Sequence, residues 1–132
     1  MSETSVNQIK LQPTSQEIWA TKYQLKDANG DPVDKSINDT FDRVAKELAS
    51  VEATGEAEEH WHKLFLWALE NGALPAGRIL SNAGAGKHKP SASLINCTVS
   101  GTIPDSMDGI LDMNKEAGMT LKAGCGIGYE FS

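Results

Sequence analysis

The 132-residue sequence lacks long apolar runs and is poor in cysteine. No stretch approaches the roughly 20 apolar residues that a helix needs to cross a bilayer. The polar region 1–13 also lacks the apolar centre of a signal peptide, so we expect a cytoplasmic protein with no membrane partner. Two cysteines, Cys97 and Cys125, are too few for a disulfide scaffold, and in the cytoplasm both should be thiols.

The sequence is also poor in positively charged residues. The chain has 12 Lys and Arg against 18 Asp and Glu, which gives a formal net charge of −6. Binding to a nucleic-acid backbone requires clustered basic side chains, and the sequence has no such cluster. We therefore expect no nucleic-acid partner.

What remains is a globular composition, with 39% hydrophobic and 23% charged residues. The length suits one domain or a piece of a larger one. Local patterns predict a mainly α-helical chain in three regions: a disordered tail over 1–13, a helical region over 14–75, and a region of different composition over 76–132.

Three helices are expected in the helical region. The capping pattern Thr14-x-x-Glu17 predicts a short helix from about residue 15, and Ser36-x-x-Asp39 predicts a second over 37–50. A turn at Asn29-Gly30 should separate them. The third helix carries an apolar stripe over 61–69 that is wide enough to predict burial on two sides.

The last region is expected to begin with an irregular loop over 76–92 and a buried strand over 93–99. Asp105 should cap a fourth helix that Gly124 ends, and the glycine-rich run 124–128 is interpreted as a turn. One strand leaves its peptide groups without partners. Either another chain supplies a second strand or this chain is an incomplete part of a larger fold.

Few side chains suggest chemistry by themselves. Cys97 is either a core cysteine or a redox thiol, which needs a second thiol within reach; Cys125 is the only candidate in the chain. The glycine-rich run could approach a ligand closely or offer amides to a phosphate. His60 and His62 diverge around a helix axis, so we expect no metal site.

Four segments in series resemble the adenosylcobalamin-dependent ribonucleotide reductases. They are residues 74–81 (LPAGRILS), 94–99 (LINCTV), 101–110 (GTIPDSMDGI) and 122–132 (KAGCGIGYEFS). Segments 17–23 and 35–41 also resemble the N-terminal region of that family. The resemblance implies that 76–132 begins the ten-stranded α/β barrel of the catalytic subunit.

The family reduces the ribose 2′-hydroxyl of ribonucleoside diphosphates or triphosphates for DNA synthesis. Its thiyl radical is generated with adenosylcobalamin, which the missing remainder would bind. A cysteine pair then becomes a disulfide, and a thioredoxin-type reductant restores it. By motif position, Cys97 matches the first cysteine of that pair. Ser81 and Asn96 match substrate-contacting positions, and Gly124 and Gly126 match a loop that lines the substrate.

The resemblance leaves three matters open. The radical cysteine and the second thiol of the pair would lie beyond Ser132, so the chain alone should be inactive and should expose Leu94, Ile95 and Val99. Cys125 stands where many relatives have glycine and is interpreted as a bystander. The alternatives are an independent helical module that binds a nucleotide or protein, and the iron- or manganese-dependent reductase class, whose radical comes from a second subunit.

Overall fold

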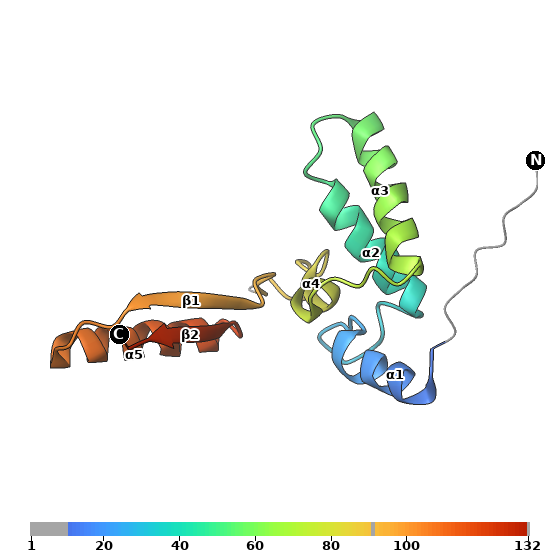
Figure 1. Ribbon diagram of the computed structural model, residues 1–132. Helices are drawn as coiled ribbons and strands as arrows, with labels where there is room; N and C mark the ends of the chain where they lie inside the picture. The colour runs from blue at the N-terminus through green and yellow to red at the C-terminus, as the bar shows by residue number, and fades with distance from the viewer. Residues whose placement is uncertain (1–10, 91, 132) are drawn as a thin grey trace, which may run out of the picture.

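The computed structural model describes residues 11–90 and 92–131, so most of the predicted tail lies outside the described residues. The described chain forms two parts that meet at α4 (Figure 1). In order, the elements are α1 (Pro13–Ile18), the π-helical turn η1 (Trp19–Tyr23), α2 (Ile37–Ala49), α3 (Gly55–Glu70), α4 (Gly77–Asn82), β1 (Cys97–Thr102), α5 (Met107–Lys122) and β2 (Gly126–Glu130). The prediction of a mainly helical chain is confirmed.

Capping signals proved right at one helix and wrong at another. Ser36 Oγ accepts a hydrogen bond from the Asp39 amide, and Asp39 accepts one from the Ser36 amide, so α2 begins with a capping box. The box expected at Thr14 is absent. Instead α1 begins at Pro13, without a side-chain cap. Proline is favoured in the first turn of a helix because its missing N–H has no intrahelical partner there.

The predicted turn between the first two helices is confirmed. Gly30 has φ of 91°, Asp27 accepts hydrogen bonds from the amides of Asn29 and Asp31, and Lys26 pairs with Pro32 in an antiparallel bridge. This loop leads the chain back to α2, and Asp34 lies between the loop and the start of that helix.

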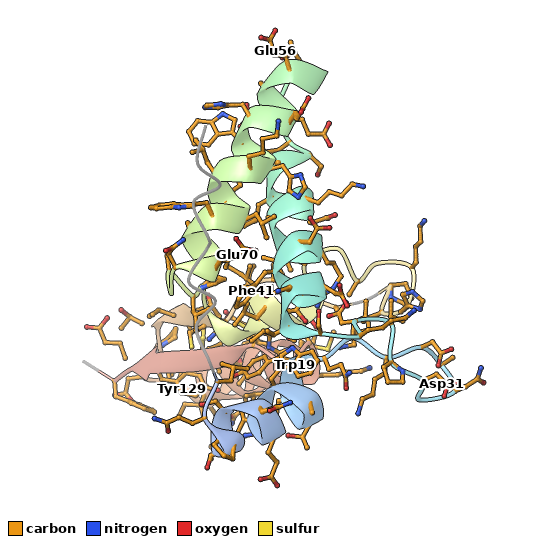
Figure 2. All side chains as sticks on the ribbon, turned by 90° about the vertical axis from the view of Figure 1, so that its right-hand side faces the viewer. Trp19, Asp31, Phe41, Glu56, Glu70 and Tyr129 are labelled. Atoms are coloured by element: carbon orange, nitrogen blue, oxygen red, sulfur yellow. The ribbon has the colours of Figure 1, made fainter. Side chains whose placement is uncertain are left out.

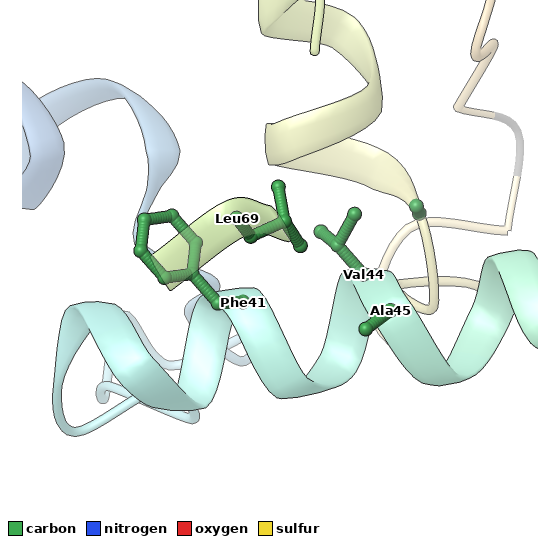
Figure 3. Close-up of a cluster of buried hydrophobic side chains, with 5 residues drawn as sticks. Phe41, Val44, Ala45 and Leu69 are labelled. Atoms are coloured by element: carbon green, nitrogen blue, oxygen red, sulfur yellow. The ribbon is translucent and has the colours of Figure 1, made fainter. Parts of the chain in front are cut away.

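The core of the helical lobe, which comprises α1 to α4, lies between α2 and α3. Its buried side chains are Phe41, Val44, Ala45, Leu69 and Ala83 (Figure 3). In Figure 2, α3 runs from Glu56 to Glu70, and its last turn lies beside Phe41 of α2. The expected burial of α3 on two sides is wrong for the described residues, because Leu64 and Trp67 are 42% and 61% exposed.

A buried ion pair attaches α4 to this core. The Arg43 guanidinium contacts the Asp34 carboxylate at 2.8 Å and also donates to the carbonyls of Leu80 and Ala83 at the end of α4. Thr40 donates to the same carboxylate at 2.7 Å. The expected loop over 76–92 therefore includes a short helix, which tertiary contacts hold in place.

The second part is a β1–α5–β2 unit. β1 and β2 pair in parallel, with Cys97 opposite Gly126 and Val99 opposite Gly128. The prediction of a single strand is wrong, because the chain itself supplies the second strand after α5. The interpretation of the whole glycine-rich run as a turn is also wrong, because β2 begins at Gly126. Strand β1 also begins later than expected, and it is largely exposed instead of buried.

Helix α5 begins one residue later than expected. Ser106 is the N-cap, and its hydroxyl accepts from the Gly109 amide, so the prediction of Asp105 as the cap is wrong. Gly124 has φ of 78° and ends the helix, as predicted. Over the described residues, no helix is both long enough and apolar enough to cross a membrane.

Candidate functional site

Cys97 stands at the first position of β1 with an exposed, free thiol. Residues alternate between the two faces of a strand. Ser100 is buried and donates to Met113 and Glu116 of α5, so Cys97 and Val99 point to the other face. We call this side of the sheet the open face. The alternative that Cys97 is a core cysteine is wrong for the described residues.

Strand β2 places glycines, which have no side chains, beside the Cys97 thiol on the open face. Gly126 and Gly128 lie opposite Cys97 and Val99 and so face the same side. A Cβ atom on Gly126 would lie 3.3 Å from the Cys97 sulfur. Glycine at this position therefore keeps the space beside the thiol free for another molecule.

Cys125 lies just before β2, which begins at Gly126. It precedes Gly126 and is buried, with its sulfur 3.3 Å from the carbonyl oxygen of Gly126. A disulfide requires the Cβ atoms to approach to about 3.5–4.5 Å with suitable directions. Both thiols are free in this structure, and they differ in surroundings because Cys97 is exposed whereas Cys125 is buried.

Arg78, near the start of α4, links the other predicted site residues. Its amide donates to the Asn96 side-chain oxygen at 3.0 Å, and its carbonyl accepts from the Ser81 hydroxyl at 3.4 Å. Asn82 of the same helix donates to the carbonyl of Ser93 at 2.8 Å. These contacts join α4 to the segment that leads into Cys97.

Gly124 ends α5, and its lack of a side chain also leaves room for the Arg78 guanidinium. Besides its positive φ, a Cβ atom at this position would lie 2.2 Å from an Arg78 guanidinium nitrogen. The structure thus gathers Ser81, Asn96 and Gly124 around Arg78. Sequence reasoning missed Arg78, although it lies inside one of the motif segments.

The amides of the glycine-rich run are already engaged within the chain. Those of Gly124, Cys125 and Gly126 donate to the carbonyls of Leu121, Thr120 and Asn96 at 2.8, 3.1 and 3.0 Å. The interpretation that this run cradles a phosphate with free amides is therefore wrong for these three groups. Glycine here provides space and conformation instead.

The described residues include no group of three or more His, Cys, Asp or Glu side chains that could hold a metal ion. Around Cys97 they offer a thiol, an amide and a guanidinium, which do not make up a binding site for a corrin cofactor.

Comparison with known proteins agrees with the motif segments. The family model described as "Ribonucleotide reductase, all-alpha domain" matches residues 9–88. The chain is also 34% identical over 115 residues to the ribonucleoside-diphosphate reductase subunit alpha of Helicobacter pylori strains 26695 and J99.

That similarity covers 84% of this chain but 13% of each relative. The aligned part is longer than the segment from residue 1 to residue 88, where the all-alpha domain match ends. The similarity therefore extends past that domain into the β1–α5–β2 unit. The chain spans only a small part of these relatives. Because the family model matches residues 9–88 and the chain is 34% identical to these relatives, the chain belongs to the ribonucleotide reductase family.

Proposed function

We propose that this chain is the N-terminal part of the catalytic subunit of a cytoplasmic ribonucleotide reductase, with Cys97 as one half of the thiol pair that reduces the substrate. The proposal rests on the position and exposure of Cys97 in a chain that belongs to this family. Cys97 is an exposed, free thiol on an open sheet face, opposite a glycine.

The proposed chemistry balances over two thiols. The ribose 2′-hydroxyl leaves as water, hydrogen takes its place, and two thiols become one disulfide, which supplies two electrons and two protons. Cys97 provides one sulfur. The second sulfur and the radical cysteine are proposed to belong to the remainder of the enzyme, because the other cysteine of this chain, Cys125, is buried whereas Cys97 is exposed. A thioredoxin-type reductant then restores the pair.

Asn96 and Ser81 are proposed to contact the ribonucleotide. The Asn96 side-chain oxygen is engaged by the Arg78 amide, whereas its amide nitrogen has no partner among the described residues. That nitrogen is suited to donate to a ribose hydroxyl. Gly124 and Gly126 line the same region without side chains and leave room for the sugar.

The names of the relatives bear on the substrate and the radical source. Both are called ribonucleoside-diphosphate reductase subunit alpha, which favours a diphosphate substrate. The motif resemblance favours adenosylcobalamin, bound by the remainder of the enzyme. The word "subunit" favours the second candidate, a radical delivered by a different subunit that contains iron or manganese.

Assays of the complete reductase distinguish the two radical sources. Turnover that requires added adenosylcobalamin supports the first. Turnover that requires a metal-loaded second subunit, without cobalamin, contradicts it and supports the second.

The role of Cys97 is tested by Cys97→Ser in the complete reductase, with Cys125→Ser as the matched control. We expect Cys97→Ser to reduce multiple turnover to below about 1% of wild type, as the loss of a reacting group does. Cys125→Ser should keep most of the activity. Full turnover by Cys97→Ser removes Cys97 from the mechanism.

A further inference from the structure

We propose that the Arg78 side chain is an anion-binding site that holds a phosphate group of the nucleotide. The identity of the ligand rests on the function proposed above. The site itself rests on the environment of the guanidinium group.

The chain contains two arginines, Arg43 and Arg78, and their surroundings differ. The Arg43 guanidinium is fully engaged by the Asp34 carboxylate and two carbonyl oxygens. The Arg78 guanidinium makes no hydrogen bond or ion pair with any described residue, although the residue is half-buried.

A guanidinium group without an internal partner keeps its five N–H donors available for a ligand. No buried side-chain nitrogen among the described residues lacks a partner. The Arg78 nitrogens therefore remain in contact with solvent, where a ligand can reach them. The planar guanidinium donates two parallel hydrogen bonds, a geometry that suits phosphate oxygens.

The backbone of Arg78 is fixed from two sides, by Asn96 at its amide and by Ser81 at its carbonyl. Its side chain lies against Gly124, where a larger residue would displace it. The backbone from which the guanidinium extends is therefore fixed before a ligand arrives, which lowers the entropic cost of binding.

Arg78 and Cys97 are near enough to serve one ligand. Arg78 contacts Gly124 and Cys97 contacts Gly126, and two residues of extended chain span at most about 7 Å between Cα atoms. The amides of the glycine-rich run are engaged, so Arg78 supplies the positive charge that those amides do not. A nucleotide with its ribose at Cys97 can therefore reach Arg78 with its phosphates.

The test is a titration of the full chain with inorganic pyrophosphate, followed by NMR of the Arg78 Nε–H group and the Gly124 amide. We expect saturable shifts at both. Arg78→Gln removes the charge but keeps a side chain that packs near Gly124, and it should weaken binding by about 10-fold or more. Arg78→Lys should retain part of the affinity. Lys115→Ala removes an exposed charge from α5 and should change affinity less than about 2-fold.

Absence of saturable shifts, or equal affinity in wild type and Arg78→Gln, overturns the inference; the partner of Arg78 would then be sought among carboxylates of another polypeptide. A second titration, with a ribonucleoside diphosphate, separates this inference from the proposed function. Shifts at Arg78 and at Gly126 support both. Shifts at Arg78 with none at Cys97 or Gly126 support the anion site and count against the proposed function.

Discussion

The helical lobe and the β1–α5–β2 unit differ in how completely they bury their apolar residues. The lobe encloses Val44 and Leu69 in its own core, and an internal ion pair connects α2 with α4. The β1–α5–β2 unit leaves Val99 and Phe131 79% and 82% exposed. A two-stranded sheet with one bare face is marginal by itself. The lobe is therefore the better-packed part, whereas the unit carries Cys97, the thiol that is proposed to react.

The largest effect that separates the two parts should come from the buried ion pair. Asp34→Ala leaves the Arg43 charge without its partner inside the lobe, which should cost about 3–5 kcal/mol of unfolding free energy. Urea denaturation followed by tryptophan fluorescence measures this. The control is Glu59→Gln, which removes an exposed pair with Lys63 and should leave the midpoint nearly unchanged. Equal losses in both variants would show that the pair does not anchor the lobe.

The same substitution in each part gives the next comparison. Val44 is completely buried, whereas Val99 is 79% exposed. Val44→Ala should cost about 2 kcal/mol because it removes two buried methyl groups and leaves a cavity. Val99→Ala should stay within about 0.5 kcal/mol. A large loss in Val99→Ala would indicate that the open face is covered in the isolated chain.

Two glycines of the second part should behave differently. Gly124→Ala forces a side chain into positive φ and against Arg78, at a cost of about 1–3 kcal/mol. Gly128→Ala meets nothing within 4 Å and should be close to neutral. Circular dichroism and the NMR signal of the Arg78 guanidinium together show whether the α5–β2 junction has moved. A neutral Gly124→Ala would contradict the contact with Arg78.

The smallest effect is a pH dependence confined to the lobe. Burial, the largest single influence, raises the pKa of Asp34, but the hydrogen bonds from Arg43, Thr40 and the Leu25 amide and the charge of Arg43 together hold that pKa below its usual value. A carboxyl with a lowered folded-state pKa stabilises the fold above its unfolded pKa of about 3.9, and this contribution disappears as the pH falls through the folded pKa.

Urea midpoints measured from pH 7 to about 2.5 should therefore fall at the acid end in wild type, and less steeply in Asp34→Asn. Parallel curves for the two proteins would show that Asp34 does not contribute to the acid limb.

Local signals predicted those features that local chemistry decides. The Ser36 capping box, the Asn29-Gly30 turn and the stop at Gly124 depend on neighbours in sequence, and all three are confirmed. The box at Thr14 failed because Pro13 offered a better first helical residue. The burial that the local pattern predicted for residues 93–99 is wrong. Leu94, Ile95 and Val99 are exposed, as the interpretation of the chain as part of a larger enzyme implies.

Features that depend on contacts distant in sequence were not predictable in the same way. Strand β2 contains glycines that local propensity disfavours in strands, yet pairing with β1 through α5 makes it a strand. The alternation of small and large residues at Gly126, Ile127, Gly128 and Tyr129 was the signal that could have revealed it. The contact of Arg78 with Gly124 joins segments that only the fold brings together.

The most direct test of the central claim maps the disulfide that forms in the complete reductase after a single turnover without reductant. Peptide mass spectrometry of the quenched enzyme should find Cys97 joined to a cysteine outside this chain, with Cys125 still a thiol. A Cys97 that remains reduced after product has formed, or that is joined to Cys125, would contradict the account.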